Sequence, residues 1–207
     1  TPFNEVIALD PGSGAQRWRY DPKISTAQRP GNRYVCRGVA YWVDEQAADA
    51  AACRSRIFMG TNDARLVALD AKTGTACADF GENGEIKIDI GMKLEWPGEF
   101  QITSAPVVSR GVVVIGSSIS DNVRVDAPRG TVRAFDARSG RPRWSWDPLV
   151  HDGIEAGHAN VWAPMSSDEE RGLVFLPTGS ASPTCGKPGR APPPRAPVDL
   201  LLALPRP

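Results

Sequence analysis

The stretch TVRAFDARSGRPRWSWDP, residues Thr131–Pro148, decides how the chain is interpreted, because it occurs more than once. A close copy, VIALDPGSGAQRWRYDP, occupies Val6–Pro22, and a weaker copy, LVALDAKTGTACADFGE, occupies Leu66–Glu82. Each copy has a short apolar run ending in Asp, a Gly four residues later, and a Trp or a small residue four residues after that. The aligned positions are Asp10, Gly14 and Trp18; Asp70, Gly74 and Ala78; and Asp136, Gly140 and Trp144. Copies about 60 residues apart form an internal repeat, which is typical of propellers and other arrays.

Each copy has the features of a β-hairpin. The apolar run alternates as a strand does, and the Asp and Gly that follow it are turn residues. The Asp carboxylate accepts hydrogen bonds from nearby backbone N–H groups, and Gly adopts a positive φ without strain. A Trp on the outgoing strand needs cover for its ring, which a neighbouring sheet in a radial array can provide. The alternative is a single β-hairpin, with the similarity of the other two stretches arising by chance. Matches at the same positions in three stretches disfavour this alternative.

The composition narrows the function classes. The 207 residues include 24 basic and 24 acidic side chains, so no basic excess indicates nucleic-acid binding. No run of 18 or more apolar residues indicates a membrane span. The 20 Gly and 19 Pro residues, with few amphipathic helix patterns, predict a mostly β protein.

The four cysteines are Cys36, Cys53, Cys77 and Cys185, without a CxxC spacing and with only two histidines in the chain. A zinc site is therefore not expected. Cys36 and Cys53 flank a predicted strand and a polar loop, and these two could form a disulfide in an oxidising compartment. Buried free thiols are an equal alternative.

Strand patterns divide the chain into half a sheet, two complete four-stranded groups and half of another sheet. The first hairpin spans residues 5–22, the two groups span 35–80 and 103–147, and the last half spans 160–179. We predict an all-β fold over residues 1–183, a partial β-propeller of about three four-stranded blades. An open arc of this kind exposes strand edges and apolar faces.

The remaining residues, 184–207, have a different composition, rich in Pro and Arg. We interpret them as an irregular tail outside the repeat pattern, produced by a truncation or a frameshift. Its last seven residues, LLALPRP, could be a degraded strand of the next hairpin, with Pro205 where the repeat carries Asp. Proline lacks the backbone N–H and would weaken such a strand.

Three segments resemble a known family: CRGVAYW (36–42), TSAPVVSRGVVVIGSSISDN (103–122) and GHANVWAPMSSDEERGLVFLPTG (157–179). With the repeated hairpins, they are similar to the quinoprotein dehydrogenases that use pyrroloquinoline quinone (PQQ), especially the membrane-bound glucose and quinate type. The likeness runs from about residue 5 to residue 183. It implies that the chain is a fragment of an eight-bladed quinoprotein propeller, with the cofactor near the propeller axis.

The resemblance also implies cofactor and metal ligands. Arg37 resembles the arginine that binds the acidic groups of PQQ, and Trp162 resembles the tryptophan that forms the floor beneath its ring. The other implied contacts are the hydroxyls of Thr103 and Ser118, the amide of Asn160, and a Ca²⁺- or Mg²⁺-binding pair, Asp121 and Asn122.

Each of these residues also has an ordinary structural role open to it. These roles are a surface arginine, strand-end hydroxyls, an Asx turn at residues 121–122, and a core tryptophan. Trp42 stands where glucose dehydrogenases commonly carry a histidine thought to sense substrate. The resemblance therefore implies a substrate-side position for Trp42 and puts glucose itself in doubt.

The resemblance implies oxidation of a hydroxyl group on a sugar, polyol or alcohol, with electrons passed to ubiquinone. It also implies a periplasmic location, in a parent protein anchored in the inner membrane. The family's general-base Asp, and the lysine that helps to polarise the quinone, match no residue of this chain. We therefore assign no catalytic residue and predict that the fragment is inactive alone. A non-enzymatic propeller scaffold that binds protein partners is the alternative.

Overall fold

The computed structural model describes residues 1–207 except 28, 152–156, 180, 183–199 and 204–207. The described chain consists of short β-strands and one short helix, and none of its helices is long and apolar enough to cross a membrane. The elements are β1 (Val6–Leu9), β2 (Gln16–Tyr20), β3 (Ala40–Val43), β4 (Ser55–Gly60), β5 (Arg65–Asp70), β6 (Glu85–Lys87), β7 (Phe100–Gln101), β8 (Val107–Ser109), β9 (Val112–Ile115), β10 (Ser118–Ile119), β11 (Val132–Asp136), β12 (Pro142–Trp146), α1 (Pro148–His151), β13 (Ser166–Asp168), β14 (Leu173–Leu176) and β15 (Leu200–Ala203).

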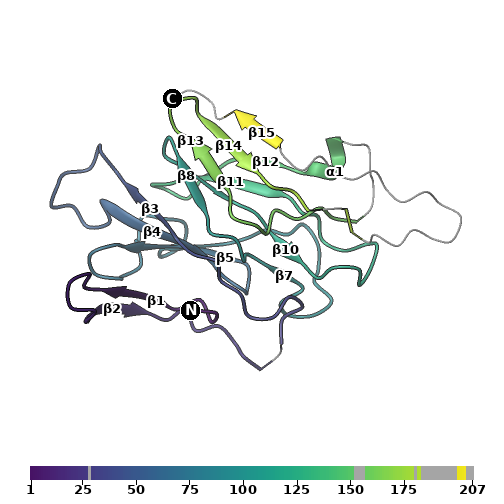
Figure 1. The fold of residues 1–207 in the computed structure, drawn as a ribbon, viewed down its shortest axis with the longest axis horizontal. Helices are drawn as coiled ribbons and strands as arrows, with labels where there is room; N and C mark the ends of the chain where they lie inside the picture. The colour runs from purple at the N-terminus through teal and green to yellow at the C-terminus, as the bar shows by residue number, and fades with distance from the viewer. Residues whose placement is uncertain (28, 152–156, 180, 183–199, 204–207) are drawn as a thin grey trace, which may run out of the picture.

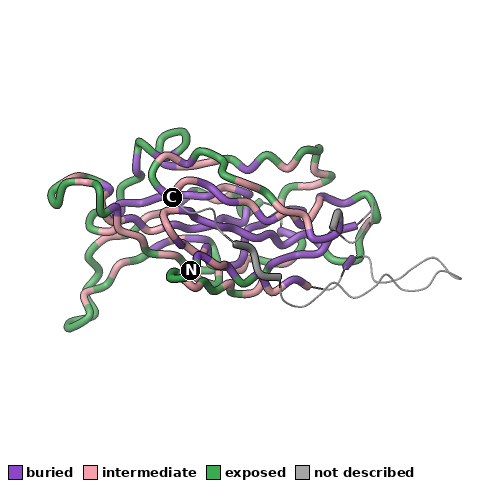
Figure 2. The backbone as a smooth tube through the Cα atoms, turned by 90° about the horizontal axis from the view of Figure 1, so that it is seen from above, coloured by how far each residue is buried: buried purple, intermediate pink, exposed green. Residues whose placement is uncertain are grey.

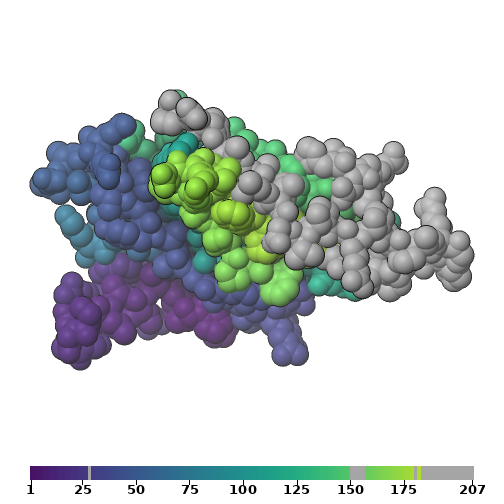
Figure 3. All heavy atoms as spheres, turned by 45° about the horizontal axis from the view of Figure 1, so that its top comes forward, coloured from purple at the N-terminus to yellow at the C-terminus, as the bar shows by residue number. Residues whose placement is uncertain are grey.

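The strands form antiparallel sheets that follow one another in chain order (Figure 1). The sheets are β1-β2, β3-β4-β5-β6, β8-β9-β11-β12 and β13-β14-β15, with the short pair β7-β10 beside them. On the surface the same order gives successive bands of colour from the N-terminal hairpin to the third large sheet (Figure 3). This arrangement confirms the predicted all-β, partial β-propeller fold.

The three sequence repeats form the same hairpin turn. The carboxylate of Asp10 accepts hydrogen bonds from the backbone N–H groups two and three residues later, and Asp70 and Asp136 do the same. The glycines that follow have nearly identical positive φ angles, 72°, 75° and 73° at Gly14, Gly74 and Gly140. A register shift also occurs at equivalent places in β1 and β11. The three similar stretches of sequence therefore fold into the same turn conformation.

The cores lie between neighbouring sheets, where buried strands run through the middle of the molecule (Figure 2). Val6, Met59 and Val67 join the first hairpin to the next sheet, and Phe58, Phe100 and Ile115 belong to the largest cluster. Val132, Val174 and Leu176 fill the gap before the third large sheet. Apolar burial of this kind stabilises the stack of sheets by roughly 25 cal/mol per Å².

The repeats do not all dock in the same way. Trp18 donates its indole N–H to the backbone oxygen of Ala71 at 3.1 Å. The second repeat has Ala78 in the place of Trp18, and there the buried Arg56 donates instead to the backbone oxygen of Arg138 at 2.7 Å. A buried arginine thus makes an inter-sheet hydrogen bond next to the repeat that has no tryptophan, one residue beyond the position equivalent to Ala71.

Several predicted strand limits are wrong. Residues 75–80 form no strand beyond an isolated bridge at Ala76, and β6 is the fourth strand of that sheet instead. The strand expected at 35–42 begins only at Ala40, because the preceding residues form the loop that carries Arg37. The pair β7-β10 was not predicted. In the tail, β15 pairs with β14, whereas residues 184–199 lie outside the described part.

The expected pairing of Cys36 with Cys53 is also wrong. Cys53 forms a disulfide with Cys77, with 5.7 Å between their Cα atoms, and Cys36 is a free, half-buried thiol. The reason is strand direction. Val43 at the end of β3 pairs with Ser55 at the start of β4, so Cys36 and Cys53 lie toward opposite ends of this strand pair.

Candidate functional site

The candidate site begins where the loops that enter the three large sheets meet. The backbone N–H of Arg37, before β3, donates to the backbone oxygen of Thr103, before β8, at 3.0 Å. The guanidinium carbon of Arg37 lies 5.0 Å from the ring centre of Trp162, before β13. Residues from the loops before three sheets therefore converge, and Trp162 remains 45% exposed. An indole face beside a guanidinium fork suits a flat, anionic ligand.

The hydroxyl of Thr103 has an unused hydrogen-bonding capacity. Its oxygen is buried and has no partner among the residues that the structure describes. Buried polar atoms are nearly always hydrogen-bonded, so an unpartnered buried hydroxyl at this position is suited to a bound ligand. Together with the partly exposed Trp162 and the guanidinium of Arg37, this hydroxyl fits a planar cofactor that carries carboxylates.

Ser118 belongs to the same region through a residue that the sequence analysis missed. The side-chain amide of Asn32 donates to the Ser118 hydroxyl oxygen at 2.9 Å, which leaves the hydroxyl proton available to another acceptor. The backbone N–H of Asn32 in turn donates to Gln101, which also donates to Asn62 and to the backbone oxygen of Arg33. Asn32 lies in a loop without a strand or motif, so no local pattern marked it.

Asn160 joins these two halves. Its side-chain oxygen accepts the backbone N–H of Ile119 at 3.2 Å, next to Ser118, and it lies two residues before Trp162. The Ser104 hydroxyl donates to the backbone oxygen of Val161 at 3.4 Å, which ties the Thr103 segment to the same strand entry. The buried Asn160 therefore connects β10 to the loop at residues 160–162.

His158 is a second residue that was not singled out, although it lies in the segment 157–179 that carries the family resemblance. Its side chain is fully buried, Nδ1 lies 3.1 Å from the amide nitrogen of Asn160, and Nε2 has no partner in the described part of the chain. Burial lowers the pKa of His158, against the opposing effects of the Asp121 carboxylate and the backbone of Ser120. The imidazole is therefore neutral at pH 7.

Asp121 and Asn122 lie on an exposed loop directly after β10. The backbone N–H of Asn122 donates to the Ser182 hydroxyl at 2.9 Å, and Asn122 has a left-handed φ of 57°. Asparagine tolerates this conformation better than most residues. One carboxylate and one amide oxygen are suitable but insufficient ligands for a hard cation, which requires further oxygen ligands from elsewhere.

Trp42 lies apart from this group. In β3, its ring is 6.4 Å from that of Phe58 and lies under the guanidinium of Arg56. It also borders an open cleft of about 1650 Å³ formed by the loop after β3 and the β8–β9 and β13–β14 turns. None of the other candidate residues lines this cleft. The substrate-side role of Trp42 stays a prediction, and these contacts do not favour it.

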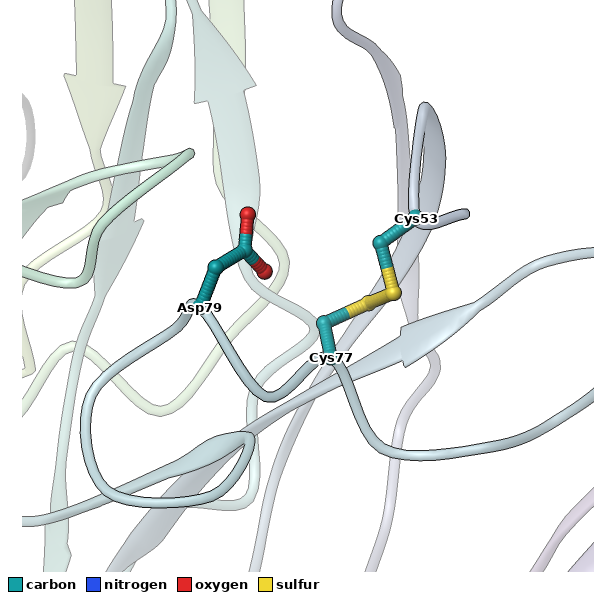
Figure 4. A group of neighbouring side chains, drawn as sticks. All are labelled: Cys53, Cys77 and Asp79. Carbon is teal, nitrogen blue, oxygen red and sulfur yellow. A yellow bond between two sulfur atoms is a disulfide. The ribbon is translucent and has the colours of Figure 1, made fainter. Parts of the chain in front are cut away.

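Within the described residues, Cys53, Cys77 and Asp79 are the one group of three Cys, His or acidic side chains close enough to share a cation (Figure 4). The two sulfurs are joined to each other, so neither is a thiolate ligand. Asp79 is already paired with Arg56 at 2.5 Å. This group is consequently a structural element and not a metal centre.

Residues 1–193 match the PQQ family described as glucose/ethanol/alcohol dehydrogenase, β-propeller domain. The chain is 36% identical over 189 residues to the glycerol dehydrogenase large subunit of Gluconobacter thailandicus, covering 87% of this chain and 25% of that protein. It is 36% identical over 208 residues to quinate/shikimate dehydrogenase (quinone) of Acinetobacter baylyi, covering 88% and 25%.

Quinoprotein glucose dehydrogenase A of Acinetobacter calcoaceticus is 33% identical over 203 residues, with coverage of 88% and 25%. Among solved structures, quinohemoprotein alcohol dehydrogenase from Comamonas testosteroni superposes with a TM-score of 0.65 at 27% identity, covering 88% of this chain and 27% of that one. The chain thus spans about a quarter of the length of these relatives.

Proposed function

Because the chain belongs to the family of PQQ-dependent quinoprotein dehydrogenases, of the membrane-bound glucose and quinate type, we propose that it forms part of a PQQ pocket. The complete enzyme would oxidise a hydroxyl group of a sugar, polyol or alcohol. The observation that carries this proposal is the meeting of Arg37, Thr103 and Trp162 from the entry loops of three different sheets.

Each residue has a distinct part in holding the cofactor. Arg37 pairs with a carboxylate or quinone oxygen, and Trp162 offers its exposed face as a floor and excludes water from one side of the ring. The hydroxyls of Thr103 and Ser118 donate to carboxylate oxygens of the cofactor. Asn160 holds Ser118 and Trp162 in position relative to each other. When bound, PQQ supplies the two-electron acceptor for the alcohol carbon.

Asp121 and Asn122 would be protein ligands of a divalent cation, Ca²⁺ or Mg²⁺, which would supply Lewis-acid chemistry at the site. We assign no proton-accepting residue to this chain. By the resemblance, the general base lies elsewhere in the longer relatives, so we expect no turnover from these 207 residues alone.

The proposed location is the periplasm, with ubiquinone as the electron acceptor of the complete enzyme. The Cys53–Cys77 disulfide supports an oxidising compartment, because structural disulfides are rare in the cytosol. The acceptor is proposed from the family resemblance alone.

The test is quenching of tryptophan fluorescence by PQQ, with and without Ca²⁺ or Mg²⁺. We expect saturable quenching in the parent chain and a higher PQQ dissociation constant in Arg37→Ala and in Trp162→Leu, fitted to the signal of the tryptophans that remain. Arg141→Ala, at an exposed hairpin position, is the control and should bind like the parent chain. No saturable quenching of the parent chain at high PQQ concentration would contradict the proposal and favour a non-enzymatic scaffold.

A further inference from the structure

The loop that carries Asp121 and Asn122 is held by a buried ion pair. Residues 121–126 are exposed to solvent apart from Arg124, whose side chain turns inward and is 15% exposed. Its Nε donates to Oε1 of Glu99 at 2.7 Å, and the Glu99 side chain is 1% exposed. Burying a carboxylate is costly unless it is paired and hydrogen-bonded, so the buried Glu99 carboxylate requires this contact with Arg124.

Glu99 is attached to the loop at two points that bracket the acid–amide pair. Its backbone oxygen accepts the N–H of Ser120 at 3.1 Å, immediately before Asp121. Its carboxylate binds Arg124, two residues after Asn122. The second carboxylate oxygen accepts the N–H of Glu95 at 2.8 Å, which fixes the orientation of the Glu99 side chain.

Arg124 is likewise oriented. Its Nη1 donates to the backbone oxygen of Asp126 at 2.9 Å, so the guanidinium closes the loop on itself as well as tying it to Glu99. The loop is thus held at Ser120 and at Arg124, on either side of Asp121 and Asn122. Asp121 and Asn122 themselves are exposed.

We propose that Glu99, through Arg124, is a positioning residue for Asp121 and Asn122, the two residues proposed to bind a divalent cation. This inference rests on the proposed function of the site. A hard cation gains little from ligands that must be ordered on binding, and the groups that orient metal ligands govern affinity without touching the ion. The Glu99–Arg124 pair orders the loop before any cation arrives.

The experiment separates positioning from simple stabilisation. Ca²⁺ is titrated calorimetrically into the PQQ-loaded chain for the parent, Glu99→Gln, Arg124→Gln and the milder Arg124→Lys. We expect the Ca²⁺ dissociation constant to rise about 10- to 100-fold in Glu99→Gln and in Arg124→Gln. The rise should be smaller in Arg124→Lys, because this variant keeps a positively charged side chain at that position. PQQ affinity without metal, measured by tryptophan quenching, should be unchanged.

Asp44→Asn is the matched control, because Asp44 is a buried carboxylate that binds Arg138 at 2.5 and 2.6 Å outside the candidate site. It should lower the melting temperature without weakening Ca²⁺ binding. Folded Glu99 or Arg124 variants with the parent affinity for Ca²⁺, or equal weakening in Asp44→Asn, would overturn the inference.

The two levels of proposal fail in different ways. If the parent chain binds PQQ but Ca²⁺ gives no binding heat, the positioning role falls and the PQQ pocket stands. If the parent chain binds no PQQ, the proposed function falls, and the positioning role falls with it.

Discussion

Trp18 lies directly on Gly74. A Cβ atom added at Gly74 would come within 2.5 Å of the Trp18 ring, and the indole N–H donates to Ala71 three residues earlier. The first hairpin is thus docked on the next sheet through a ring that occupies the space of a missing side chain. The same glycine also needs its left-handed φ of 75°.

Gly74→Ala is predicted to destabilise the chain more than Gly14→Ala. Both glycines have the same positive φ, but an added Cβ at Gly14 meets nothing within 4 Å. The shared backbone strain should cost about 1–2 kcal/mol, and displacement of Trp18 should add about 1–3 kcal/mol in Gly74→Ala alone. Urea unfolding of the two variants measures the difference, and equal losses would show that the docked ring contributes nothing.

The Cys53–Cys77 disulfide is predicted to stabilise the folded chain by about 3 kcal/mol, as expected for a loop closed across 24 positions. Cys53→Ser with Cys77→Ser should therefore lower the melting temperature, and reducing agent should lower that of the parent but not of the double variant. Cys36→Ser serves as the control, since Cys36 is unpaired and should leave the response to reductant intact. Insensitivity of the parent to reductant would argue against the bond.

Asn32→Asp is predicted to weaken PQQ binding. Asn32 now donates to Ser118, so the hydroxyl is free to donate to the cofactor. A carboxylate at residue 32 would instead attract that proton and add negative charge near an anionic ligand. We expect a loss of about 1.5–3 kcal/mol, or roughly 10- to 150-fold in affinity, by fluorescence quenching. Asn83→Asp, in an exposed turn, makes the same chemical change and should have no effect on affinity.

His158 is predicted to make stability fall as the pH falls below about 6.5. Burial lowers the pKa of His158 in the folded state. Below pH 6.5 the unfolded chain therefore binds a proton at this imidazole more readily than the folded chain does. Stability is then full above 6.5 and declines below it, by up to about 1.4 kcal/mol per pH unit. Urea unfolding from pH 7.5 to 5.5 should show a shallower decline in His158→Gln than in the parent, and parallel curves would contradict the prediction.

Much of the fold could be predicted because the repeat is local. At Asp10, Asp70 and Asp136 the turn is closed by hydrogen bonds to residues two and three positions later, so each hairpin is visible in a short window of sequence. The fourth strand of the first large sheet was misplaced for the opposite reason. Residues 75–80 continue the apolar pattern, but the ladder with β5 is made by β6, after a further turn.

The candidate site was only partly predictable. Arg37, Thr103 and Trp162 were identified by resemblance, and the structure brings them together, although their binding roles remain proposals. Asn32 and Glu99 were not identified, because both lie outside the hairpin repeat and outside the three segments that carry the resemblance. His158 lies in the third of these segments, but its type and position there gave no reason to single it out. Their importance comes from partners 2 to 86 residues away.

The sequence by itself determined the hairpins, their order and the family, since turn closure and strand alternation depend on neighbours a few residues apart. The tertiary structure alone decided which cysteines pair, that Arg56 links two sheets, and that Glu99 contacts Arg124. These contacts depend on which strand ends meet and on the register of the sheets that carry them. Packing of the whole chain sets both, and no local window of sequence contains that information.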